Sequence, residues 1–131
     1  MADAKSNYAE RITLDWLLGG SNPSRPSGRW AALFTSDPTD SDIGNELSGG
    51  SYERVAATFN AAQTNSGVTT STTTLDLNWT NMPTAVVTHV GIYTESTGGE
   101  LIYHGPLNDS KTLTTGDNFT INAGNLTVTE Q

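Results

Sequence analysis

The chain of 131 residues contains no cysteine and few basic residues, with six lysines and arginines against 14 acidic residues. The absence of cysteine excludes disulfides, thiolate metal sites and cysteine nucleophiles. The net charge of −8 argues against binding to nucleic acid or to an anionic membrane surface, because both attract basic faces. No apolar run approaches the roughly 18 residues of a membrane-spanning helix. We therefore predict neither a nucleic-acid partner nor a membrane partner.

Charged residues of either sign are scarce, at 15% of the chain, and serine, threonine, asparagine and glycine dominate instead. Polarity of this kind is compatible with disorder. Three tryptophans, four tyrosines and regularly placed β-branched residues nevertheless predict a folded chain. The length fits one domain that folds without disulfides.

A helix near the N-terminus is indicated by large apolar residues that recur every four positions, at Tyr8, Ile12 and Trp16. Asn7 is the predicted N-cap, with Glu10 as its capping-box partner. The pair Gly19-Gly20 supplies a left-handed stop, so we expect the helix to end near Leu18.

Two interpretations of this apolar stripe remain open. The stripe packs on the sheet of its own domain, or it forms an arm that docks on a neighbouring subunit. Residues 21–28, with Pro23 and Pro26, resemble a linker that lets such an arm extend. The expected organisation is therefore an N-terminal arm at 1–20, a linker at 21–28 and a β-domain at 29–131.

Most of the remaining chain has β-strand signals separated by turn residues. Predicted strands cover residues 29–35, 52–60, 72–80, 85–94, 100–107, 119–122 and 126–129, and the last two are expected to pair. We expect Leu75, Leu77 and Trp79 on one face of their strand and a mobile loop at residues 63–71. The fold class is mainly β, an antiparallel β-sandwich or barrel with one N-terminal α-helix.

The clearest hairpin joins residues 85–94 to residues 100–107. If Glu95 pairs with Glu100, His104 lies opposite Gly91 and His89 lies opposite Pro106. Both histidines then share one face, which we expect in solvent or at a subunit interface. The opposite face, expected in the core, carries Val90, Ile92, Leu101 and Tyr103. Two histidines this close are able to bind a metal, but hydrogen bonding is the favoured interpretation, and no metal or cofactor is predicted.

An acidic loop follows the apolar run at residues 30–35. Asp37 precedes Pro38 and is predicted to open a β-turn in which its carboxylate accepts backbone N–H groups. The loop carboxylates, at Asp37, Asp40, Asp42 and Glu46, lack the spacing of an EF-hand. A weak cation site is the alternative interpretation.

The sequence offers no support for catalysis. No serine lies in a nucleophile elbow, and the glycine pairs lack the helix and the lysine of a phosphate loop. No pair of carboxylates has a defensible role as acid and base. We predict that the protein is not an enzyme.

Three stretches of the sequence resemble a known protein family. They are the stretch from Trp30 to Tyr52, the block His89-Val90-Gly91-Ile92-Tyr93 and the block Gly98-Gly99-Glu100-Leu101-Ile102-Tyr103-His104-Gly105-Pro106-Leu107. Members of this family are small virion proteins of tailed bacteriophages that are commonly labelled phage tail fibre proteins. The resemblance runs from residues 5–20 to residues 123–128. It implies a structural virion protein that is assembled in the cytoplasm of the bacterial host.

Two functions fit that resemblance. The leading hypothesis is a capsid decoration or cement protein that bridges neighbouring capsomers, with the major capsid protein as its partner. The alternative is a tail fibre or baseplate component that contacts tail proteins and takes part in host attachment, with Trp30, Tyr52 and Tyr93 as candidate saccharide-binding aromatics. In both cases we expect a homo-oligomer, a trimer or dimer. The predicted interface consists of Tyr8, Ile12, Trp16, Asp37, Asp40 and Asp42.

Overall fold

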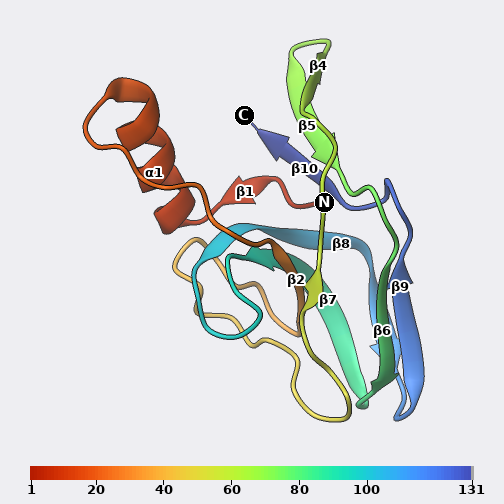
Figure 1. Cartoon of the computed structure of the whole chain (residues 1–131). Helices are drawn as coiled ribbons and strands as arrows, with labels where there is room; N and C mark the ends of the chain where they lie inside the picture. The colour runs from red at the N-terminus through yellow and green to blue at the C-terminus, as the bar shows by residue number, and fades with distance from the viewer. Residues whose placement is uncertain (131) are drawn as a thin grey trace.

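The computed structural model describes residues 1–130, in which one helix accompanies ten strands (Figure 1). The helix is α1 (Asn7–Leu18). The strands are β1 (Ala4–Lys5), β2 (Trp30–Phe34), β3 (Val55–Ala56), β4 (Gln63–Asn65), β5 (Val68–Thr72), β6 (Leu77–Met82), β7 (Ala85–Tyr93), β8 (Leu101–Leu113), β9 (Asp117–Ile121) and β10 (Thr127–Glu130). The predicted class, mainly β with one N-terminal helix, is confirmed.

The strands form three antiparallel sheets. The central sheet has the order β1-β8-β7-β2-β3, a small sheet has the order β10-β5-β4, and β6 pairs with β9. In Figure 1 the β4–β5 hairpin projects at the top of the view and the β6–β9 ribbon lies at the right. Residues from both the ribbon and the small sheet lie next to the face of the central sheet that carries Ile92. Among residues 1–130 the sheets do not close into a barrel.

The main core lies between the central sheet and the β6–β9 ribbon. Side chains from both contribute to one cluster that includes Leu33, Val90 and Ile92 from the sheet and Leu77 and Trp79 from β6. Trp79 also stacks on Phe119 of β9, with ring centroids 5.8 Å apart. Burial of this apolar surface is the main force that holds the two layers together.

The β7–β8 hairpin has the predicted register in its middle part, and the register is shifted toward both ends. His89 pairs with Pro106 and Gly91 pairs with His104. Near the turn a β-bulge places Tyr93 opposite Leu101, because one extra residue of β8 is left without an opposing partner.

Because of this bulge, one prediction about the two faces of the hairpin, the position of Leu101, is wrong. Val90 and Ile92 are buried in the main core as expected, and Tyr103 packs against that core. Leu101 instead lies on the opposite face, in a second cluster with Phe34, Ala32 and Tyr93. A shift of one residue reverses the face of a side chain, so the bulge moves Leu101 from one core to the other.

Three predictions about the outer strands are wrong. Residues 63–71 contain the hairpin of β4 and β5 rather than a mobile loop. The last two strands do not pair with each other, since β9 joins β6 and β10 joins β5. Leu75 is 66% exposed and lies before β6, whereas Leu77 and Trp79 are buried as expected.

Candidate functional site

The root of α1, at Ser6 and Asn7, is held by hydrogen bonds to β8 and to the acidic loop. Ser6, rather than the predicted Asn7, is the N-cap, because its Oγ accepts the N–H of Ala9 at 3.1 Å. The Ser6 N–H donates to the carbonyl of Ile102 at 2.9 Å, and its hydroxyl donates to the carbonyl of Leu101. Asn7 donates its backbone N–H to the carbonyl of Asp40 at 2.9 Å. The helix therefore leaves the central sheet in a defined direction.

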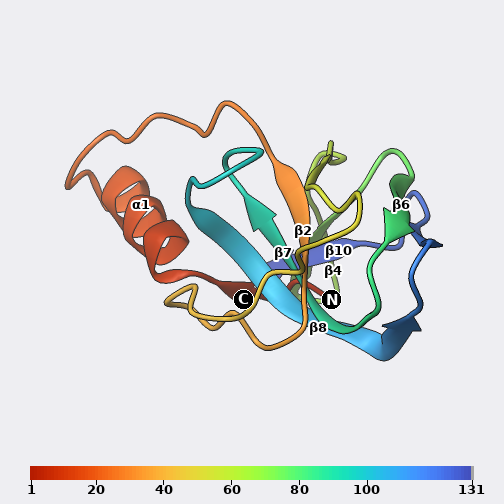
Figure 2. The ribbon, with the colours of Figure 1, turned by 90° about the horizontal axis from the view of Figure 1, so that it is seen from below.

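The far end of α1 stands away from the sheets (Figures 1 and 2). It ends at Gly19, which has a left-handed φ of 80° as its predicted stop role requires. The α1 tip, residues 14–18, has an apolar surface in solvent, with exposed fractions of 58% for Leu14, 62% for Trp16, 64% for Leu17 and 79% for Leu18. For Trp16 the interpretation that the stripe packs on its own sheet is therefore wrong, whereas Tyr8 and Ile12 are half-buried.

The carboxylates of the acidic loop, residues 36–46, make contacts within the chain. Asp37 Oδ1 accepts the N–H of Thr39 at 2.9 Å, so the predicted turn role is confirmed. Asp40 Oδ1 lies 2.8 Å from His104 Nε2, and Asp37 Oδ1 lies 3.8 Å from His104 Nδ1. Asp42 Oδ1 accepts the hydroxyl of Tyr93 at 2.5 Å.

The histidine face is the face of the β7–β8 hairpin that carries His89 and His104. It was expected in solvent or at a subunit interface, but the acidic loop covers His104. His104 is only 6% exposed, because Asp37 and Asp40 lie against it, and it faces neither open solvent nor an open interface. His89 is half-buried, and its Nδ1 lies 2.8 Å from the hydroxyl of Thr88. The two histidines therefore share one face, as predicted, but have separate partners.

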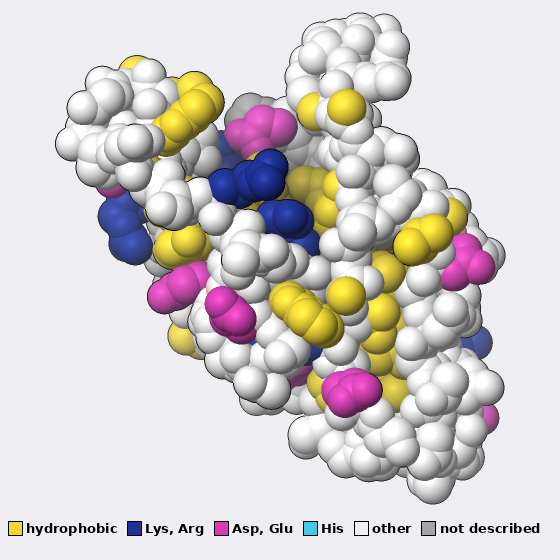
Figure 3. Space-filling model, in the orientation of Figure 1, with side chains coloured by type: hydrophobic (Ala, Val, Ile, Leu, Met, Phe, Trp, Pro, Cys, Tyr) yellow, Lys and Arg dark blue, Asp and Glu magenta, His cyan; other side chains and the backbone are white. Residues whose placement is uncertain are grey.

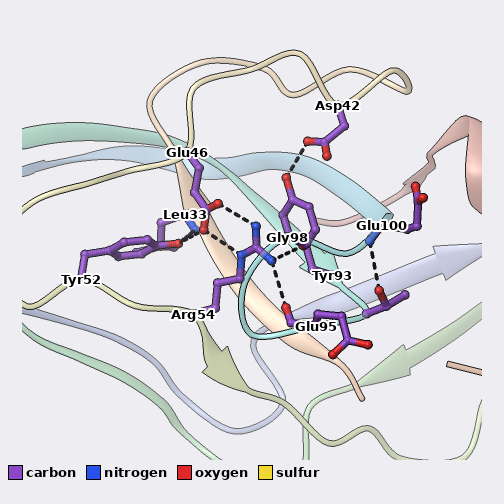
Figure 4. A network of polar contacts seen from close by, with 10 residues as sticks. Leu33, Asp42, Glu46, Tyr52, Arg54, Tyr93, Glu95, Gly98 and Glu100 are labelled. Carbon is purple, nitrogen blue, oxygen red and sulfur yellow. Dashed lines mark hydrogen bonds and ion pairs between the residues drawn. The ribbon is translucent and has the colours of Figure 1, made fainter. Parts of the chain in front are cut away.

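A network centred on Arg54 joins the acidic loop to the β7–β8 turn (Figure 4). The Arg54 guanidinium donates to both carboxylate oxygens of Glu46 at 2.9 Å and lies 3.6 Å from the ring centroid of Tyr93. It also donates to the carbonyls of Glu95 at 2.9 Å and Gly98 at 2.7 Å. The Arg54 side chain is 8% exposed, so this bidentate pair is largely desolvated.

Two tyrosines complete the Arg54 network. Tyr52 donates its hydroxyl to Glu46 at 2.7 Å and accepts the N–H of Leu33 at 3.0 Å. Burial, followed by the hydrogen bond to Glu46, raises the pKa of Tyr52. Burial and the hydrogen bond to Asp42 raise the pKa of Tyr93. Burial alone lowers the pKa of Arg54, but the hydrogen bond and charge of Glu46 outweigh it and the pKa is raised.

The aromatics proposed for saccharide binding are thus engaged inside the fold. Tyr93 is 4% exposed and stacks on Phe34, with ring centroids 6.2 Å apart. Tyr52 uses its hydroxyl in the Arg54 network. Trp30 is half-buried and packs against the same cluster as Tyr93.

A second polar contact joins the two ends of the chain to the central sheet. Glu130 of β10 pairs with Lys5 of β1 and accepts the hydroxyl of Tyr103 at 2.6 Å. Burial raises the pKa of Glu130, but hydrogen bonds from Lys5 and Tyr103 more than offset it and the pKa is lowered. Burial and the same carboxylate raise the pKa of Tyr103.

A mostly apolar pocket of about 250 Å³ lies between the small sheet and the central sheet. Ile92, Ile102, Phe59, Tyr103 and Val128 are among its lining side chains, and Arg29 and Glu130 add charge. Figure 3 shows a hollow with hydrophobic side chains at its base, beside the lobe that β4 and β5 form. Sequence reasoning missed this pocket because the small sheet was itself not predicted.

The structure separates the predicted interface residues into two groups. Tyr8, Asp40 and Asp42 surround a polar pocket beside the start of α1. Ile12 and Trp16 line an apolar groove with Pro23 and Pro26. Asp37 lies near the first group, through its contact with His104.

Within residues 1–130, no three or more histidine or acidic side chains are grouped as a metal site requires. No helix in that range combines the length and apolar content of a membrane crossing. The polar cluster around Arg54 holds the acidic loop against the β7–β8 turn.

The chain matches a protein family described as podophage GP4 fiber I protein gp80, and the match covers residues 4–129. The chain belongs to this family. A comparison with curated proteins found no match. Membership makes the chain a phage fibre protein and part of the virion, which confirms the resemblance seen in the sequence. It favours the fibre alternative over the capsid cement hypothesis, because the family is described by a fibre rather than by a shell component.

Proposed function

We propose that this protein is a non-enzymatic structural component of a phage tail fibre, and that it assembles with neighbouring tail proteins through α1. The observation that carries the proposal is the exposed α1 tip, in a chain that matches a fibre family over residues 4–129. Large contiguous apolar patches are rare on isolated soluble proteins and mark sites of association.

Helix α1 is suited to such a contact because its root is fixed and its end is apolar. Contacts with β8 and β1 hold the helix at the central sheet. A tryptophan that combines a large apolar surface with an N–H donor is a common anchor in interfaces. The acidic loop supports the root of α1 through Asp40 and Ser41, which both bond Asn7.

The proposal is tested by making virions with Trp16→Ala. We expect particles with intact heads that lack this protein and adsorb poorly to host cells. Leu75→Ala is the matched control, because Leu75 is a similarly exposed apolar residue far from α1 in sequence. Particles that lose head stability while host adsorption persists would instead support the capsid cement hypothesis.

A further inference from the structure

We propose that the α1 tip of one copy inserts Trp16 into the apolar pocket between the small and central sheets of a second copy. This inference rests on the proposed assembly role of α1 and adds the identity of the partner and of the receiving site. Three observations carry it: the direction of α1, the size and lining of the pocket, and the charges on the two surfaces.

The direction of α1 keeps the tip outside its own pocket. The hydrogen bonds of Ser6 and Asn7 fix the root of the helix against β8 and the acidic loop. With the root in this position, Trp16 remains 62% exposed. The apolar tip therefore gains burial from a neighbouring molecule while these contacts stay intact.

The pocket has the size and lining that an indole requires. An apolar cavity of roughly 150 Å³ is enough for one benzene molecule. This pocket has about 250 Å³, which leaves room for the second ring. Phe59 and Tyr103 give aromatic faces, and Ile92 and Ile102 give aliphatic contacts. Aromatic pairs of this kind add stabilisation beyond the area that they bury.

The charges around the tip and the pocket are complementary. The last turn of α1 contains Asp15 and no basic residue, and the carbonyl end of a helix carries a partial negative charge. Arg29 lines the pocket and donates to the carbonyl of Pro26 at 2.9 Å. Among the described residues Arg29 has no carboxylate partner, whereas Glu130 is already paired with Lys5. Asp15 of an incoming tip is thus matched to Arg29.

The contact joins different surfaces of the two copies. A heterologous contact of this type closes into a ring or continues as a filament. Every copy in a ring, and every interior copy in a filament, then gives one tip and receives one, so each such pocket is completed by a residue from its neighbour.

Because the chain contains no cysteine, a thiol-specific crosslinker reacts only with the cysteines that are introduced. One variant carries Leu17→Cys at the tip, and another carries Ala62→Cys at the pocket. The two are mixed and treated with a short bismaleimide, and non-reducing and denaturing gels measure the crosslinked dimer. We expect dimer in the mixture, and a loss of about tenfold or more when the tip variant also carries Trp16→Ala. Leu75→Cys replaces Ala62→Cys as the control and should give little dimer.

Charge reversal provides a second, independent measurement. Asp15→Arg at the tip or Arg29→Glu at the pocket should each reduce crosslinking, and mixing the two reversed variants should restore it. Circular dichroism confirms that each variant is folded. Equal crosslinking with Leu75→Cys, or no dimer in any mixture, would overturn the inference. The proposed fibre role would survive that result if Trp16→Ala still removed the protein from virions, since the tip would then bind a different tail protein.

Discussion

The acidic loop and the α1 tip differ in whether their side chains have partners within the chain. In the loop, Asp37, Asp40, Asp42 and Glu46 all bond to groups of the same chain. At the tip, Trp16 and Leu17 remain more than half exposed. The loop is therefore a brace that holds the histidine face and the β7–β8 turn. The tip is an apolar surface that its own chain leaves exposed, and we propose that a partner covers it.

Residue type alone therefore does not identify a contact surface. Exposed carboxylates at Asp37 and Asp40 suggest a contact surface, yet each has a partner inside the chain. The two regions also differ in what a substitution should change. Substitutions in the brace should lower the stability of the isolated protein, and substitutions at the tip should affect assembly while leaving stability nearly unchanged.

Arg54→Met should produce the largest loss of stability. It removes the cation from a pair in which Arg54 is 8% exposed and Glu46 is 26% exposed, and it leaves the carboxylate without its ionic partner. Breaking a buried pair in this way costs about 3 kcal/mol. Urea unfolding followed by tryptophan fluorescence measures the change. Arg11→Met on the exposed surface of α1 is the control, with a change within about 0.5 kcal/mol.

Tyr93→Phe should have a smaller effect, because it removes one hydroxyl and keeps the ring beneath Arg54. The lost hydrogen bond to Asp42 contributes about 1 kcal/mol to the free energy of unfolding. The same urea titration applies. A loss as large as that of Arg54→Met would show that the hydroxyl, rather than the ion pair, holds the acidic loop.

Glu130→Gln removes the carboxylate that pairs with Lys5 of β1, the strand that precedes α1. The lowered pKa of Glu130 means that its contribution to stability is present above the unfolded carboxyl pKa of about 4.3 and is lost as pH falls through the folded pKa. Because the pair is partly exposed, the contribution at neutral pH should be under about 1 kcal/mol. Urea midpoints of the two proteins should therefore differ at pH 7 and converge in acid. A constant difference across this range would contradict the assignment.

Trp16→Ala should have the smallest effect on the isolated monomer, within about 0.5 kcal/mol, because the side chain is mostly in solvent. Measurements at low protein concentration avoid any contribution from association. A loss of several kcal/mol would place Trp16 in the core and would remove the contrast with the brace.

Local patterns were sufficient to predict the helix and the middle part of the hairpin. The four-residue spacing of Tyr8, Ile12 and Trp16 and the stop at Gly19 predicted α1, because both depend on neighbouring residues alone. The pairs His89–Pro106 and Gly91–His104 followed from the turn in the same way. The N-cap was placed one residue late because Ser6 and Asn7 are both good caps, and tertiary contacts decide between them.

Long-range contacts were beyond the reach of these patterns. The threonine-rich segment at residues 63–71 resembles a loop until β10, distant in sequence, supplies a partner for β5. The sequence gives little sign of the role of Arg54, which is one of six basic residues in the chain. Its role depends on Glu46, Tyr93 and two carbonyls that only the folded chain brings together. The predicted interface residues lie on two separate surfaces, which the sequence patterns did not indicate, and their role in assembly stays a prediction.

A cryo-electron microscopy map of the virion, with this fold docked into it, would show directly where the protein lies and what α1 contacts. We predict that the protein lies in the tail fibre and that the Trp16 side of α1 contacts a neighbouring subunit. We also expect the acidic loop to keep its contacts with His104 and Tyr93. A position on the capsid shell, or a fibre in which the α1 tip faces solvent, would contradict the proposed function.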